Sequence, residues 1–217
     1  MMTKLYLLVQ ASSFFISVLY YKTLKKTELR YFIPFLFITL IVEILGYWLT
    51  TKNIRNYLLY NIFTTFEFIF YAFIFYKNLR KTGFKKTVAL FMPLYVAAVI
   101  YNLSFGQGMH SFHTITFLLG SFFMVVFCCL YFYESVLPEH LDHELTKQPF
   151  FWVCTGLLLF YLGSVIINAL FEYLRSFNMQ AEGIKIYGLI NQSLNIVLYS
   201  SFIFAFVLCR NTNKISS

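Results

Sequence analysis

The sequence is poor in charged residues, and above all in acidic ones. Only 12% of its residues are charged, and nine Asp and Glu stand against seventeen Lys and Arg. The single aspartate, Asp142, excludes an intramembrane protease that uses a pair of aspartates. The chain also lacks a G-x-S-x-G motif, a Walker-type loop and a Lys in its last apolar segment. These absences exclude serine hydrolases with that motif, P-loop nucleotide hydrolases and retinal proteins.

Apolar residues are abundant instead. Hydrophobic residues make up 59% of the chain and aromatic residues 22%, and the mean hydropathy is +0.69. These values are far from those of soluble domains and predict an integral membrane protein. The net charge of +8 comes from Lys and Arg in the short gaps between apolar runs. This distribution favours membrane lipids as partners and speaks against nucleic acid.

Seven apolar segments are long enough to cross a bilayer, because about 20 helical residues span about 30 Å of hydrocarbon. The gaps between them are short, so residues 1–217 are expected to form a single transmembrane domain without a soluble domain. The predicted fold is an all-α, polytopic membrane helical bundle. We interpret the first segment as a retained helix, since no small-residue cleavage site follows its apolar core. The segments are 5–21, 31–51, 57–79, 87–105, 114–137, 150–175 and 189–209.

The basic residues between these segments predict the orientation. If the N-terminus lies outside, twelve of the seventeen Lys and Arg lie on the cytoplasmic side. Short loops rich in Lys and Arg stay in the cytoplasm, so we expect an N-out/C-in topology. The twelve are Lys22, Lys25, Lys26, Arg30, Lys77, Arg80, Lys81, Lys85, Lys86, Lys147, Arg210 and Lys214.

Cysteine and glycine positions give two further expectations. On this topology all four cysteines fall in the inner half of the membrane or at its edge, so four free thiols are expected. Gly156 and Gly163, seven residues apart, give the sixth segment a narrow face that favours close helix packing. The cysteines are Cys128, Cys129, Cys154 and Cys209.

Polar side chains recur at helical spacing inside four of the segments. Glu67 is expected about 15 Å below the outer start of the third segment, close to the middle of the bilayer. A charge at that depth costs about 2.5–3.5 kcal/mol, so polar stripes on different helices should face one another. We therefore predict an outward-facing polar cavity between the second, third, sixth and seventh segments. Its candidate residues are Glu43, Asn61, Glu67, Tyr71, Asn168, Glu172, Asn191, Gln192, Asn195 and Tyr199, with Asn102 and Gln10 as weaker members.

Such a cavity is compatible with three functions. The first is a non-enzymatic ligand-sensing or accessory signalling module that binds a small molecule or a lipid headgroup. The second is a channel or proton-coupled transporter that uses Glu67 and Glu43. The third is an intramembrane lipid-modifying enzyme, although no His lies inside an apolar segment to act as a base. The same polar groups can also hold helices together without a ligand, and no cofactor is expected.

Two histidine pairs have the spacing of metal ligands. His110 and His113 are predicted outside the membrane, and His140 and His143 inside, so one ion cannot use all four. Each pair alone would make at most a loose site, and no metal centre is expected. His113 has a second candidate role as a pH-sensitive lid over the cavity.

A resemblance rests on two stretches, QPFFWVCTGLLLFYLG at residues 148–163 and Asn191, Asn195 and Tyr199 of the last segment. In these stretches the chain resembles uncharacterised seven-helix bacterial membrane proteins, which are similar to the input modules of sensor kinases. The resemblance implies a sensory or accessory role in a bacterial cytoplasmic (inner) membrane. A cytoplasmic signalling partner would then have to contact the inner surface, where the basic loops 22–30 and 77–86 are the expected contact points.

Overall fold

Helices make up nearly all of the described chain. The computed structural model describes residues 2–137, 144–176 and 180–215, without the side chains of residues 3, 172–176, 180–182 and 212–215. This part of the chain contains helices and no strand, which confirms the all-α prediction. The elements are α1 (Met2–Leu19), α2 (Tyr21–Leu24), η1 (Glu28–Tyr31), α3 (Phe32–Thr51), α4 (Tyr57–Asn78), α5 (Thr82–Phe105), α6 (Thr114–Ser135), η3 (Leu145–Lys147), α7 (Pro149–Ser176) and α8 (Gln180–Ile215).

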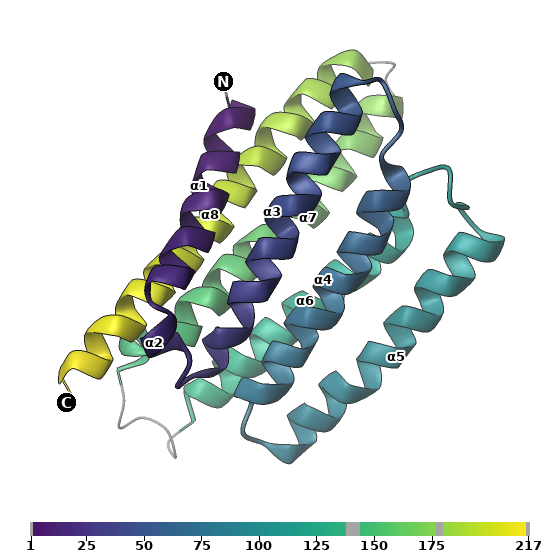
Figure 1. Cartoon of the computed structure of the whole chain (residues 1–217). Helices are drawn as coiled ribbons and strands as arrows, with labels where there is room; N and C mark the ends of the chain where they lie inside the picture. Colours follow the sequence, from purple (N-terminus) through teal and green to yellow (C-terminus); the bar gives the residue numbers. More distant parts are fainter. Residues whose placement is uncertain (1, 138–143, 177–179, 216–217) are drawn as a thin grey trace.

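The long helices run up and down through one bundle (Figure 1). α1 starts near the top of this view, and α8 ends near the bottom. The connections from α3 to α4 and from α5 to α6 lie at the top, together with the end of α7. α2, the turn from α4 to α5 and the start of α7 lie at the bottom. We name these two ends of the bundle the upper end and the lower end.

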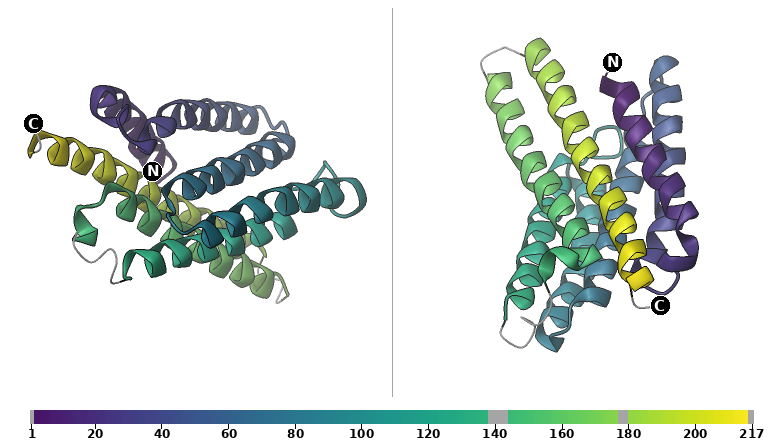
Figure 2. Two further views of the ribbon diagram at one scale, coloured as in Figure 1. Left: turned by 90° about the horizontal axis from the view of Figure 1, so that it is seen from below. Right: turned by 90° about the vertical axis from the view of Figure 1, so that its left-hand side faces the viewer.

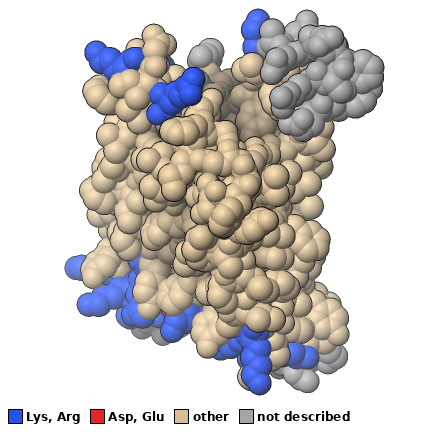
Figure 3. Space-filling view, turned by 90° about the vertical axis from the view of Figure 1, so that its right-hand side faces the viewer, with Lys and Arg blue, Asp and Glu red and all other residues tan. Residues whose placement is uncertain are grey.

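Within the described residues, six helices are long and apolar enough to cross a membrane, by length and composition. α1 adds a shorter apolar stretch, Lys4–Leu19. Lys and Arg side chains gather at the two ends of the bundle, and a band of uncharged surface separates them (Figure 3). This pattern is compatible with an integral membrane protein. The six stretches are Glu28–Thr51, Tyr57–Asn78, Thr82–Phe105, Thr114–Ser135, Pro149–Phe171 and Gly183–Asn211.

Several helices extend beyond the apolar segments from which they were predicted. α5 begins at Thr82 rather than at residue 87, and α8, with 36 residues, continues past both ends of segment 189–209. Segments 22–30 and 77–86 were expected as loops but are mostly helical, because α2, η1, α4 and α5 reach into them. Hydropathy detects only the apolar part of a helix, whereas polar residues of good helical propensity prolong it.

A layer of aromatic side chains fills the lower half of the bundle. The rings of Phe32 and Phe202 lie 5.1 Å apart and those of Phe75 and Phe127 lie 5.9 Å apart, both within the usual range for aromatic pairs. Side chains from α3, α4, α6 and α8 thus pack together at this level. We name as the aromatic layer six side chains that are all 0% exposed: Phe32, Tyr71, Phe75, Phe127, Phe202 and Phe206.

α7 and α8 pack as a close hairpin, which leans away from α3 and α4 toward the upper end (Figure 2, right). Gly156 permits the close approach, because a methyl group at this position would lie 2.6 Å from Cβ of Ser201. At Gly163 the same methyl group would lie 2.5 Å from a terminal carbon of Leu194. The narrow face predicted for these two glycines is therefore confirmed.

Replacing Gly156 by alanine should lower the stability of the protein. The new methyl group meets the rigid Cβ of Ser201, and overpacking of this kind costs about 1–3 kcal/mol. Thermal unfolding in detergent micelles measures the change. Gly188→Ala on α8 is the matched control, because no atom lies within 4 Å of its added methyl group. Equal melting temperatures for the two variants would contradict the close contact.

Candidate functional site

A cavity of about 550 Å³ lies in the upper half of the bundle, above the aromatic layer. α3, α4, α7 and α8 form most of its wall, and the start of α6 with the residues before it completes the wall. Its described lining residues are Glu43, Asn56, Tyr57, Tyr60, Phe63, Thr64, Glu67, Phe112, Thr114, Phe117, Phe160, Asn168, Phe171, Ile184, Tyr187, Asn191, Asn195 and Tyr199.

Two tyrosines from neighbouring helices hold Glu43. The hydroxyl of Tyr6 in α1 donates to Oε2 of Glu43 at 2.8 Å, and the hydroxyl of Tyr60 in α4 donates to the same oxygen at 3.4 Å. Gly46 makes room for Tyr60, since a methyl group there would overlap with the tyrosine oxygen. The carboxyl group of Glu43 therefore joins α1, α3 and α4.

Glu67 lies at the floor of the cavity. Its side chain is 8% exposed, and the exposed part lines the cavity. Tyr71, one turn toward the lower end, neighbours this carboxyl group. The Tyr71 hydroxyl lies close enough to interact with this carboxyl group, although the contact falls short of full hydrogen-bond geometry. A carboxylate has about four acceptor positions, so Glu67 keeps hydrogen-bonding capacity for an occupant of the cavity.

Amide side chains line the α7 and α8 side of the cavity. The Asn168 amide donates to the Ser164 carbonyl at 2.7 Å, and the Asn195 amide donates to the Asn191 carbonyl at 2.9 Å. Each bond fixes the side chain against its own helix, so the amides form a static part of the wall. Glu172 follows Asn168 by one turn on α7, but its side chain lies outside the described residues.

Asn61 and His113 fasten the connection between α5 and α6 to α4. The Asn61 amide donates to the Ser111 carbonyl at 2.9 Å, and its oxygen accepts the His113 backbone N–H at 3.1 Å. The His113 ring lies between the hydroxyl groups of Thr64 and Thr116. Asn61 was expected to line the cavity, but it positions the connection that walls the cavity.

Other polar residues expected at the cavity also lie elsewhere. Asn102 is buried at the end of α5, where its amide donates to Oε1 of Gln107 at 2.9 Å. Tyr71 belongs to the aromatic layer, and Gln192 is half-buried on α8 outside the lining. Gln10 is 0% exposed on α1, and its amide has no hydrogen-bond partner among the described residues.

Sequence reasoning missed the tyrosine from α1 and most of the aromatic wall. Tyr6 holds Glu43, and Phe112, Phe117, Phe171 and Tyr187 line the cavity. In a chain with 22% aromatic residues, no single Phe or Tyr stands out as a wall residue. The connection before Thr114, GQGMHSFH, carries no apolar pattern that would mark Phe112 as a wall residue.

The histidines do not form a metal centre in the described part of the chain, where no group of three or more His, Cys, Asp and Glu gathers. His110 is exposed, whereas the ring of His113 is 0% exposed and both of its nitrogens are hydrogen-bonded. His113 is therefore a fixed part of the wall support and not a movable lid. His140 and His143 lie outside the described residues.

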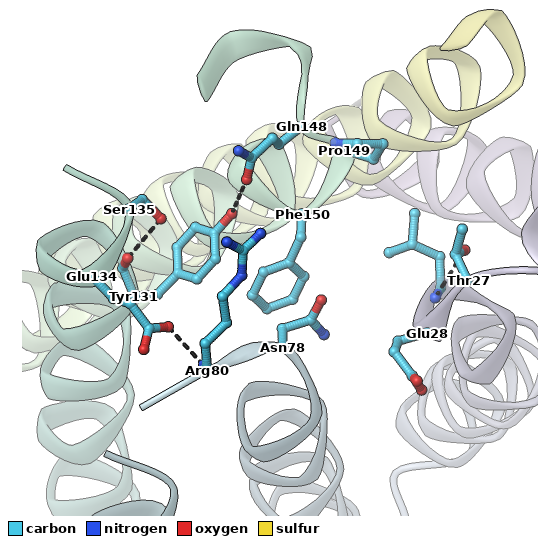
Figure 4. Close-up of a pocket in the computed structure, with 11 residues that line it drawn as sticks. Thr27, Glu28, Asn78, Arg80, Tyr131, Glu134, Ser135, Gln148, Pro149 and Phe150 are labelled. Carbon is cyan, nitrogen blue, oxygen red and sulfur yellow. Dashed lines mark hydrogen bonds between the residues drawn. The ribbon is translucent and has the colours of Figure 1, made fainter. Parts of the chain in front are cut away.

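A second pocket of about 350 Å³ opens at the lower end (Figure 4). Glu134 accepts the backbone N–H groups of Arg80, at 2.8 Å, and of Lys81, which fixes the turn between α4 and α5 against α6. The Tyr131 hydroxyl donates to Oε1 of Gln148 at 3.3 Å and so reaches the start of α7. Figure 4 shows the Arg80 side chain extending toward these two residues. The contacts of this pocket thus serve to join helix ends.

Comparison of the chain with models of protein families, with curated proteins and with solved structures finds no match. Function is therefore inferred from the cavity, its side chains and the distribution of charge. The features that bear on function are the two acids, the aromatic wall and the amides of the cavity, and the aromatic layer below them.

The stability of the protein should fall as the pH drops from about 6.5 to about 4. Burial lowers the pKa of His113 from 6.5 to about 4, so in this range the unfolded chain binds a proton that the folded protein does not bind. His113→Gln should remove this part of the pH dependence. Thermal unfolding of both proteins at several pH values measures the difference, with the exposed His110→Gln as control. Parallel pH profiles for His113→Gln and the unchanged protein would contradict the assignment.

Proposed function

We propose that the protein is a seven-span membrane protein with N-out/C-in topology that binds a small ligand in the upper cavity. Its role is ligand sensing or accessory signalling, without catalysis. Support for the seventh span comes from the 18 residues of α1, which cover about 27 Å at 1.5 Å per residue. Support for the orientation comes from the twelve of seventeen basic residues that fall between or after the apolar segments on the side of the lower end.

The closed floor of the cavity is the observation that carries this proposal. Below Glu67, the aromatic layer fills the bundle with side chains that are 0% exposed. The lower pocket shares no lining residue with the cavity. A ligand in the cavity therefore cannot pass to the lower pocket in this conformation, as expected of a binding protein.

Signal output is assigned to the lower end. The two basic segments expected to contact a partner, 22–30 and 77–86, meet there, and both contribute residues to the lower pocket, among them Glu28 and Arg80. Anionic headgroups of the inner leaflet would attract the same basic surface. The partner of the proposed module is thus a cytoplasmic protein bound at this end, beside anionic membrane lipids.

A proton-coupled transporter or channel is the second candidate, and the register of α4 favours it. Glu67 in the cavity, Tyr71 and Phe75 in the aromatic layer, and Asn78 in the lower pocket follow at spacings of four, four and three residues. They share one face of α4. If the aromatic layer opened, this face would connect the two pockets.

An intramembrane enzyme is the least supported candidate. The Thr64 hydroxyl lies 2.7 Å from Nε2 of His113, a distance suited to a nucleophile and a base. The same hydroxyl also contacts the Tyr60 carbonyl at 2.8 Å, and the His113 ring is 0% exposed and bonded at both nitrogens. The pair thus serves to hold the connection before α6 against α4.

Thiol labelling tests the orientation and the closed floor together. Asn191→Cys in the cavity and Asn78→Cys in the lower pocket are introduced into a chain whose four native cysteines are replaced by alanine. A membrane-impermeant maleimide should label Asn191→Cys in intact cells and Asn78→Cys only after permeabilisation. The reverse pattern would contradict the orientation, and labelling of both from outside would favour the transporter.

A further inference from the structure

The upper cavity holds two carboxyl groups, and no basic side chain faces them among its described lining residues. The two groups belong to Glu43 and Glu67. Both acids lie well inside α3 and α4, where the surroundings are apolar and an uncompensated carboxylate is costly. A ligand that brings a positive charge would remove this cost.

Glu67 is better placed than Glu43 to bind that charge. Two tyrosine hydroxyls already donate to Oε2 of Glu43 and hold it against α1 and α4. Both acids line the cavity, and Glu67, which is 8% exposed, has only the Tyr71 hydroxyl beside its carboxyl group. Glu67 is thus the acid with more hydrogen-bonding capacity left for an occupant, and Glu43 provides a second carboxyl group on the adjacent helix.

The wall of the cavity suits an organic cation better than a bare metal ion. Nine of its eighteen described lining residues are Phe or Tyr. Aromatic faces attract ammonium groups, and several of them together form the cages that bind alkylated ammonium ions. A volume of about 550 Å³ also exceeds the needs of a single metal ion, which would require a compact set of oxygen ligands. The amides of Asn168 and Asn195 provide polar contacts for the rest of such a molecule.

We propose that the ligand of the upper cavity is a small organic ammonium compound whose positive group binds Glu67 and whose apolar part packs against the aromatic wall. This inference rests on the proposed function, because it names the chemical class of the ligand for the same cavity. The proposed ligand is a soluble amine from outside the cell.

Binding to the unchanged protein gives the first test, in nanodiscs and by calorimetry. The probes are phenethylamine, its uncharged analogue phenethyl alcohol, and sodium chloride alone. Phenethylamine should bind at least about tenfold more tightly than phenethyl alcohol, because only the amine forms the charge pair. Sodium chloride should give no saturable heat and should not displace the amine.

Acid-to-amide variants locate the binding group. Glu67→Gln should weaken phenethylamine binding by about 30-fold or more and leave phenethyl alcohol nearly unchanged. Glu43→Gln should have a smaller effect, since its carboxyl group is already bonded to tyrosines. Glu28→Gln is the matched control, because Glu28 lines the lower pocket and should not affect binding.

A second variant, in the aromatic wall of the cavity, tests the proposal even if Glu67→Gln does not fold. Tyr187→Leu removes one aromatic face from the cavity and should weaken binding of phenyltrimethylammonium by about fivefold, the loss expected for one cation–π contact. Melting temperatures of all variants serve as the folding control.

The possible results separate the ligand class from the function. Equal binding of phenethylamine and phenethyl alcohol would overturn the ammonium proposal and leave a ligand-binding cavity. Saturable binding of sodium ions that displaces the amine would overturn it in favour of an inorganic cation. If none of these compounds binds and Asn191→Cys is also inaccessible to maleimide, the proposed function itself is overturned.

Discussion

A carboxyl group among apolar helices must find a partner inside the protein, and the upper half of this bundle is arranged around that requirement. Glu43 has such partners in the hydroxyls of Tyr6 and Tyr60. Glu67 has fewer partners within the protein, and the exposed part of this residue lines the cavity. The large cost of burying charge in a bilayer makes such an incomplete arrangement costly to keep unless it serves a purpose.

α4 connects all the functional regions of the molecule. Its first half carries Glu67 into the cavity, its second half carries Tyr71 and Phe75 into the aromatic layer, and Asn78 ends it at the lower pocket. Both ends are joined by hydrogen bonds to distant parts of the sequence. Asn61 binds the connection before α6, and Glu134 binds the turn that follows α4. Contacts of this kind fix the height of Glu67 relative to the other helices.

The fold was predictable from the sequence to the extent that apolar runs have sharp ends. α3 and α4 begin and end within about one residue of the predicted segments, because polar residues such as Lys52 follow directly. The polar continuations of α5 and α8 were not predictable in this way, since helical propensity alone sets few limits there. The free state of all four cysteines agrees with their predicted positions.

The site was predictable in its polar part and not in its aromatic part. Glu43, Glu67, Asn168 and Asn195 are rare residue types in apolar segments, and helical spacing is enough to place them on inward faces. Phe112 and Tyr6 look like any other aromatic residues of the chain. Their roles follow from contacts between segments distant in sequence, which no local pattern contains.

α8 is one continuous helix of 36 residues, about 54 Å long at 1.5 Å per residue. Tyr187 and Asn195, in the first half of α8, line the cavity. Arg210, near the other end of α8, donates to the Tyr20 hydroxyl at 3.0 Å. Phe202 and Phe206, in its second half, pack into the aromatic layer. One unbroken element therefore joins the wall of the cavity to the contact with Tyr20, so any displacement of the upper part of α8 has to be accommodated by the packing around its lower part.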